Sequence, residues 1–138
     1  HYKLWEDELV LALPAKHRWA KKKEISVEEL SEEPFIMREV GSGTLRIMEE
    51  YLRISQSEGT DSLNVVAHLG TSTAVKEGIS ILSSRAVETE IKAGILKALK
   101  VKGLSMSRSF YLIRDKRKIA SPLCQAMLDF LQATSNKQ

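Results

Sequence analysis

The amino-acid sequence predicts an α/β fold built on an open sheet. Short apolar runs that are typical of buried strands alternate along the chain with segments of helical periodicity. Glycine, proline and capping residues separate most of these segments. Hydrophobic residues make up 43% of the 138 residues and charged residues 28%, which is the composition of a folded domain rather than a disordered one.

The first predicted strand is the apolar run at 9–13, which ends at Pro14. A strand that is apolar at every position is typically buried on both faces of a sheet. A capping box then begins a short helix, because the Ser26 hydroxyl can accept from the first turn while Glu29 reaches back to the amide of Ser26. A second buried strand is predicted at 35–38.

A helix is predicted near 43–54, directly after two closely spaced glycines. Its apolar residues Leu45, Met48 and Leu52 recur at helical spacing, with charged residues between them. Ser121 and Pro122 are a cap and a first-turn proline, and they predict a C-terminal helix. Further strands are predicted at 63–69, 79–83, 96–101 and 107–114, and further helices at 71–77 and 86–93.

Two hydroxyl-rich loops each follow a predicted strand and precede a predicted helix. In an open sheet, ligands bind beyond the carboxyl ends of the strands, and helix N-termini favour anions. We therefore predict an anion site at the two loops. Its predicted residues are Ser42, Gly43, Thr44, Thr71, Ser72 and Arg38.

Two alternatives stay open at this site. The segment Gly41–Thr44 can be a plain helix cap and turn without a ligand. Arg38 can form a surface ion pair with Glu39 instead of adding charge to the site. The glycine loop lacks the Lys-Ser or Lys-Thr pair of a Walker loop and the third glycine of a dinucleotide fingerprint.

The sequence shows no arrangement of residues for catalysis or metal binding. One cysteine and three dispersed histidines lack the spacing of a structural zinc site. Neither His17 nor His68 has a visible nucleophile arrangement around it. We therefore expect no enzymatic activity, no cofactor and no metal ion, and we interpret Cys124 as a small core residue.

The segment 16–23 carries the densest positive charge and includes Trp19. Such a segment could contact phosphates through charge and stacking, but its place between Pro14 and an acidic helix start favours a solvated connector. A formal charge of +3 is too small to indicate nucleic-acid binding. No apolar run approaches the length of about 20 residues that is needed to span a bilayer. The single cysteine agrees with a cytoplasmic location.

The segment 34–44, Pro-Phe-Ile-Met-Arg-Glu-Val-Gly-Ser-Gly-Thr, resembles the effector-binding domain of LysR-type transcriptional regulators, in the branch that controls carbon fixation and sulfur metabolism. The resemblance covers nearly the whole chain, and the matching segments occur in the same order as in the family. It continues at 7–11, 17–20, 69–76, 79–87, 108–113 and 121–122. The resemblance implies a periplasmic-binding-protein-like fold of two α/β lobes joined by crossing strands, with an effector in the cleft.

The resemblance also implies a domain organisation. Residues 1–14 would form a crossing strand or hinge, residues 15–106 an essentially complete second lobe, and residues 107–138 the return strand and C-terminal helix of a first lobe that is only partly present. The implied partners are a small anionic effector and further copies of the chain, as a homodimer or homotetramer that uses helix 44–54 and the strand after it. DNA would be bound only through an N-terminal winged helix-turn-helix that this sequence does not include, and no membrane partner is implied.

Besides the absent part of the first lobe and the absent DNA-binding domain, two further departures from the family are visible. The family usually carries a further helical turn and an Ala-Gly-Leu-Gly segment where Gly78 here meets Ile79 directly, and we expect missing residues and a break at that point, with a true deletion as the alternative. Leu45 separates Thr44 from Arg46, whereas the family often has arginine directly after the threonine, so we assign Arg46 no role.

Two other functions remain to be compared with a regulator. A solute-binding protein of a transport system has the same fold, and an upstream signal peptide or lipobox would indicate it. An enzyme on a related two-lobed fold would need a carboxylate or nucleophile constellation, which the sequence lacks.

Overall fold

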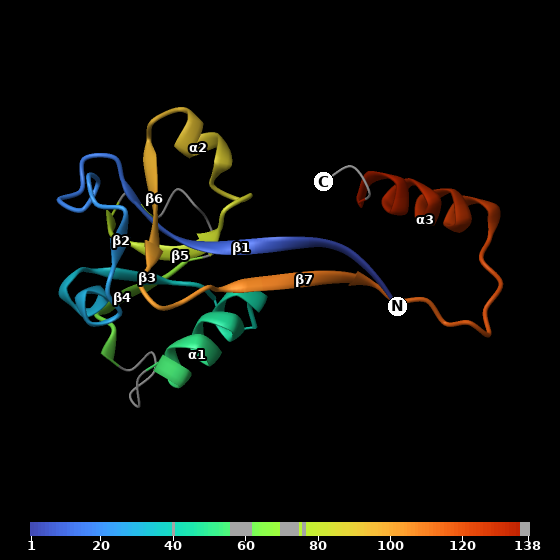
Figure 1. The fold of residues 1–138 in the computed structure, drawn as a ribbon, viewed down its shortest axis with the longest axis horizontal. Coiled ribbons are helices and arrows are strands. Elements are labelled where there is room, and N and C mark those ends of the chain that lie inside the picture. The colour runs from blue at the N-terminus through green and yellow to red at the C-terminus, as the bar shows by residue number, and fades with distance from the viewer. Residues whose placement is uncertain (40, 56–61, 70–74, 76, 136–138) are drawn as a thin grey trace. The chain divides into compact units, whose positions relative to one another are not determined.

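The structure is a computed structural model, and it describes residues 1–39, 41–55, 62–69, 75 and 77–135. The chain forms two compact units (Figure 1). One unit comprises Glu8–Ser107, and the other comprises His1–Asp7 together with Arg108–Gln138.

The larger unit is built on β1 (Tyr2–Pro14), which continues into it from the smaller one. β1 pairs antiparallel with β5 (Ser80–Ser83) on one side and with β6 (Leu96–Val101) on the other. β6 also pairs in parallel with the short β2 (Glu24–Ile25), which the sequence did not predict. The apolar run at 9–13 lies in the middle of this sheet and is buried on both faces, as predicted.

Two further strands lie beyond β5. β3 (Phe35–Met37) pairs in parallel with β4 (Val65–His68). A parallel bridge joins Phe35 to Ile79, the residue before β5. β3 therefore has β4 on one side and the start of β5 on the other.

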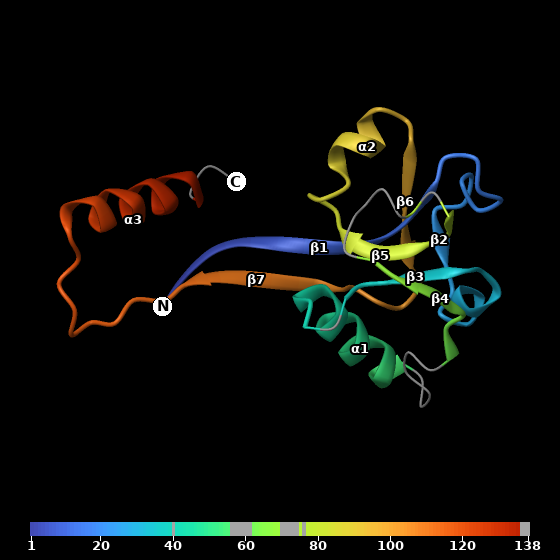
Figure 2. The same ribbon diagram turned by 180° about the vertical axis from the view of Figure 1, so that it is seen from behind.

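Helices cover both faces of this sheet. α1 (Gly43–Ser55) and α2 (Glu88–Lys92) lie on opposite sides of β1 and β5 (Figure 1 and Figure 2). Leu45, Met48 and Leu52 of α1 pack into a core cluster with Leu9 and other strand residues, and they are 8%, 2% and 0% exposed. They therefore face their own sheet, and the use of helix 44–54 in an oligomer stays a prediction.

α1 agrees with the predicted helix near 43–54, whereas α2 is shorter than the predicted helix at 86–93. The predicted helix at 71–77 falls largely outside the described residues. Among the described residues, no helix is long and apolar enough to cross a membrane.

The short connection at Gly78 is continuous. The amide of Gly78 donates to the carbonyl of Val75 at 3.4 Å, and the amide of Ile79 donates to the carbonyl of Pro34 at 2.9 Å. The expected break in the chain between Gly78 and Ile79 is absent, and missing residues at this point stay a prediction, with a true deletion as the alternative. A tight turn at glycine suffices to bring Ile79 beside β3, because a residue without a side chain can approach the Pro34 carbonyl closely.

In the smaller unit, β7 (Ser107–Leu112) pairs with β1. α3 (Pro122–Ser135) begins as predicted, with the Ser121 hydroxyl accepting from the amide of Cys124 at 3.2 Å. Cys124 is exposed, so its interpretation as a core residue is wrong. Apolar residues on one side of α3 are also exposed, with Leu123 at 82%, Met127 at 56% and Phe130 at 65%.

Candidate anion-binding site

The carboxyl ends of β3 and β4 lie at the same edge of the sheet. The two strands are parallel, with Met37 opposite His68, and the amide of Leu69 donates to the carbonyl of Met37 at 2.9 Å. The chain leaves β3 into the glycine loop and leaves β4 after Leu69. The fold therefore has the parallel strand ends that the predicted site requires, although Thr71 and Ser72 lie outside the described residues.

The glycine loop forms the start of α1. Gly41 has a φ of 89°, a left-handed conformation that favours glycine. The Ser42 amide donates to the carbonyl of Glu39 at 3.1 Å, and the Ser42 hydroxyl accepts from the amide of Leu45 at 3.5 Å. Ser42 is thus the N-cap of α1, with a long and hence weak capping bond.

The cap does not use the full hydrogen-bonding capacity of this loop. A serine hydroxyl can donate one hydrogen bond and accept two, so Ser42 can cap the helix and still donate to an anion. Gly43 is exposed and Thr44 is buried, at 4% exposure, in the first turn of the thirteen-residue helix. The partial positive charge of this helix end favours an anion near the loop.

Arg38 directly follows β3 and pairs with Glu39. Its Nε donates to Oε2 of Glu39 at 3.1 Å and its Nη2 to Oε1 at 3.0 Å. The guanidinium lowers the pKa of the Glu39 carboxyl by hydrogen bonding to its charged form. The ion-pair alternative is therefore what the structure contains, and a role of Arg38 in anion binding stays a prediction that requires Arg38 to release Glu39.

The basic segment at 16–23 is held against the 3-10 helix η1 (Glu28–Glu32). Arg18 pairs with Glu32 and Glu33, and Lys22 pairs with Glu29. Trp19 is only 1% exposed, so its ring is not available to stack on a base. The segment is a connector that is fixed to the core, and phosphate recognition by stacking is excluded here.

His17 has a structural setting in the larger unit. Nδ1 of His17 accepts from the amide of Trp19 at 3.0 Å, and its Nε2 lies 3.3 Å from Oε2 of Glu33. Because Nδ1 is an acceptor, the Nε2 nitrogen carries the proton and donates to the carboxylate. Within the described ranges, no group of His, Cys, Asp and Glu side chains could hold a metal ion.

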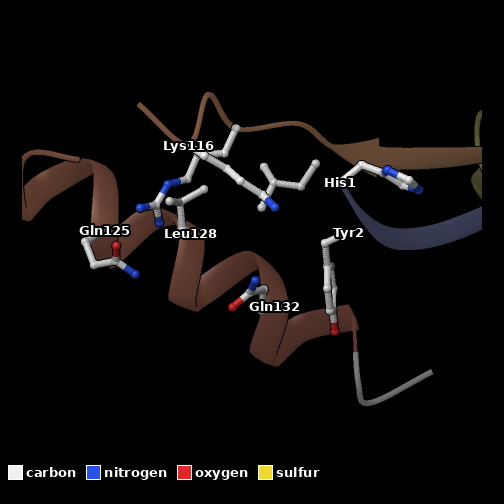
Figure 3. A pocket seen from close by; sticks show the side chains of 8 residues that line it. His1, Tyr2, Lys116, Gln125, Leu128 and Gln132 are labelled. Carbon is white, nitrogen blue, oxygen red and sulfur yellow. The ribbon is translucent and has the colours of Figure 1, made fainter. Parts of the chain in front are cut away.

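The smaller unit contains a pocket of about 330 Å³ (Figure 3). Side chains of α3, such as Gln125 and Gln132, face His1, Tyr2 and Lys116 across it. None of the predicted site residues lines this pocket. It is therefore separate from the candidate site at the carboxyl ends of β3 and β4.

A family model described as the LysR substrate binding domain matches residues 1–136. The transcriptional activator CmpR of Synechocystis is 37% identical over 134 residues, which are 93% of this chain and 43% of CmpR. The RuBisCO operon transcriptional regulator of Allochromatium vinosum is 32% identical over 132 residues, which are 91% of this chain and 42% of the relative. The chain thus spans less than half the length of these regulators.

Solved structures with the same fold include effector-binding domains. The regulatory domain of Synechocystis CcmR in complex with 2-PG has a TM-score of 0.73 and 28% identity, covering 96% of this chain and 65% of that one. The effector binding domain of QuiR in complex with shikimate has a TM-score of 0.77 and 20% identity, covering 99% of this chain and 65% of that one. The second likeness shows the fold alone.

Proposed function

Because the chain belongs to the LysR substrate binding domain family, we propose that it is the effector-sensing part of a LysR-type transcriptional regulator. The relatives named above are transcriptional regulators. In this proposal the domain binds a metabolite and performs no chemistry. DNA is bound in the cytoplasm by a separate winged helix-turn-helix of the same protein.

The effector is a small anion held at the carboxyl ends of β3 and β4. The observation that carries this proposal is that two parallel strands end at the same edge of the sheet, where a hydroxyl-rich loop leads from β3 into α1. Ser42, Gly43 and Thr44 would supply amides and hydroxyls from one loop. Thr71 and Ser72 would supply them from the other. The CcmR domain, which is solved with 2-PG bound, supports an effector of this size.

Effector binding would act on DNA through a change in population. A ligand that binds one arrangement of a two-lobed domain more tightly than another favours that arrangement. In an oligomer, the favoured arrangement changes the positions of the attached DNA-binding domains. The proposal therefore requires only differential binding, with no covalent step.

The test uses the full-length regulator and a thermal-shift panel of small carboxylates, phosphate esters and sulfur oxyanions that includes 2-PG. The best ligand is then titrated by calorimetry into variants. Ser42→Ala and Thr44→Ala should each weaken its affinity about tenfold or more, because charge-assisted hydrogen bonds are lost. Stabilisation by no member of the panel would overturn the proposal.

Ser26→Ala is the matched control, because Ser26 caps η1 in the same unit. Its hydroxyl accepts from the amide of Glu29 at 3.3 Å. Losing this cap should lower stability by about 1 kcal/mol and leave effector affinity unchanged. If Ser42→Ala behaves as Ser26→Ala does, the glycine loop is only a helix cap.

We also propose that the regulator is an oligomer, a homodimer or a homotetramer, in which copies meet along β4. β4 has only one neighbouring strand among the described residues, and it exposes Val66 at 55% and, just after the strand, Leu69 at 46%. An exposed apolar edge strand is a surface on which a second chain can pair. Val66→Lys should therefore shift full-length protein toward monomer in light scattering, whereas Ile95→Lys, at a comparably exposed residue before β6, should not.

A further inference from the structure

The pocket of the smaller unit has positively charged walls. Its volume of about 330 Å³ is at the lower end of the range for small-molecule sites. Arg114 and Lys116 line it from the loop that follows β7, and Tyr2 of β1 lines it as well. Among the described residues that line the pocket, none is acidic. The pocket therefore has the size and the charge to hold a small anion.

The two cationic side chains are not neutralised by the protein. In the part of the chain that the structure describes, neither Arg114 nor Lys116 forms an ion pair. Asp115 lies between them in sequence, but its Oδ1 accepts from Nε of Arg117 at 3.2 Å. Like charges that line one pocket repel each other, and an anion bound between them turns this repulsion into attraction.

α3 supplies hydrogen-bond donors from the wall that faces Lys116 (Figure 3). Gln125, Leu128 and Gln132 are three and four residues apart, so they share one side of the helix. Each glutamine amide carries two N–H groups. Gln125 donates one of them to Oδ1 of Asp129 at 2.8 Å, which leaves the other for a ligand. Amide donors and cations thus line the same space.

The pocket is on the side of α3 that does not carry its exposed apolar residues. Because each residue of a helix turns by about 100°, the side of Gln125, Leu128 and Gln132 is opposite the side of Met127 and Phe130. Another part of the full-length protein can therefore cover the apolar side without filling the pocket.

From this arrangement we infer that the pocket is a second anion-binding site, whose ligand is a small dianion, either a dicarboxylate or a phosphate. Arg114 and Lys116 pair with its charged oxygens, and Gln125 and Gln132 donate to them. A guanidinium suits this role because its planar set of donors matches a carboxylate or phosphate group. The inference goes beyond the proposed effector site, because the two sites share no residue.

The experiment follows the acetylation of Lys116 by an N-hydroxysuccinimide ester in the full-length regulator, measured by mass spectrometry. Malonate and inorganic phosphate are the probes, each titrated in a chloride buffer. Either anion should slow the acetylation of Lys116, because it pairs with the amine. Lys118 is the control, since it is exposed on the same loop but does not line the pocket. Its acetylation rate should not change.

Two substitutions locate the bound anion. Arg114→Gln should raise the anion concentration that half protects Lys116 about tenfold, because a charge-assisted interaction is lost. Arg114 is exposed, so the melting temperature should stay the same. Lys118→Gln removes the same charge outside the pocket and should leave the protection of Lys116 unchanged.

The outcomes separate this site from the proposed effector site. Protection of Lys116 that persists in Ser42→Ala but weakens in Arg114→Gln supports the pocket, whether or not the glycine loop binds an effector. Protection that is lost in Ser42→Ala would come from the glycine loop and would overturn the inference. Equal slowing at Lys116 and Lys118 would indicate general screening by salt, and slowing by neither anion would exclude the site. A Lys116 that does not react even without an anion would show that another part of the regulator fills the pocket, which also overturns the inference.

Discussion

Position 78 requires a glycine because neighbouring atoms leave no room for a side chain, and not because of its own backbone angles. A Cβ atom at this position would lie 2.5 Å from the carbonyl oxygen of Pro34 and 3.2 Å from its carbon. Both are backbone atoms that also hold Ile79 beside β3. We expect Gly78→Ala to lower the free energy of unfolding by about 1–3 kcal/mol, as other overpacked sites do, when measured by urea denaturation.

Gly94 provides the control for this prediction. Its φ is 74°, and a Cβ there would meet no atom within 4 Å. Asparagine tolerates the left-handed region, so Gly94→Asn should be less destabilising than Gly78→Ala. Equal stability of Gly78→Ala and the parent protein would show that the chain near Pro34 can move aside at no cost.

Single residues were predictable from sequence where their partners are close in the chain. The caps at Ser26 and Ser121 depend on residues three positions away, and both are present. The surroundings of Trp19 and Cys124 depend on distant segments. Trp19 is buried although charged residues surround it in sequence, and Cys124 is exposed although its residue type is usually buried.

At the scale of the element, the capping box of η1 sets a pH dependence. Lys22 donates to Glu29 at 2.8 Å and the amide of Ser26 donates to it at 2.9 Å. These bonds lower the pKa of Glu29 from 4.5 to about 2. Because the pKa is lower in the folded state, the bonds stabilise the fold above pH 4.5, and this stabilisation is lost as the pH falls toward 2.

The measurement is an NMR titration of the Glu29 carboxyl combined with acid unfolding. Lys22→Met should raise the pKa of Glu29 toward its ordinary value. Glu29→Gln should remove part of the stability change between pH 4.5 and 2, whereas Glu28→Gln, on the same helix but outside the capping box, should not. A Glu29 carboxyl that titrates near pH 4.5 would contradict the capping-box geometry.

β1 and β7 are joined by a buried ion pair. Nε and Nη2 of Arg108 donate to Oδ2 of Asp7 at 2.9 and 2.8 Å, and the Asp7 side chain is only 3% exposed. Removing one member of such a pair leaves a buried charge. Arg108→Gln should therefore lower the free energy of unfolding by about 3–5 kcal/mol.

A double-mutant cycle separates this pair from packing. Asp7→Asn combined with Arg108→Gln should be more stable than the sum of the two single losses implies, because no charge remains buried. The exposed pair of Arg117 and Asp115, with side chains 91% and 38% exposed, is the control. Arg117→Gln should change stability by less than about 1 kcal/mol.

At the scale of the whole molecule, the sequence predicted the order of strands and helices along the chain better than it predicted which elements lie side by side. Periodicity depends on local residues, so the helix near 43–54 and the buried run at 9–13 were confirmed. The pairing of β2 with β6 joins residues far apart in sequence, and no local signal marks it. For the same reason, nothing in the local sequence shows that the start of β5 lies beside β3.

The smaller unit exposes an apolar surface on one side of α3. Leu123, Met127 and Phe130 recur at helical spacing and are all more than half exposed. The CcmR and QuiR domains extend beyond this chain, which covers 65% of each. We expect the remaining part of the domain in the full-length regulator to cover this side of α3.

The prediction compares one substitution in two chains. In the 138-residue chain, Met127→Lys should reduce the binding of a hydrophobic fluorescent dye and change stability by less than about 0.5 kcal/mol, because the side chain is already exposed. In the full-length regulator the same change should be destabilising by about 2 kcal/mol or more, because it would bury a charge. Gln125→Lys, on the opposite side of α3, should be neutral in both chains. A neutral Met127→Lys in the full-length protein would mean that this side of the helix stays exposed and is open to another partner.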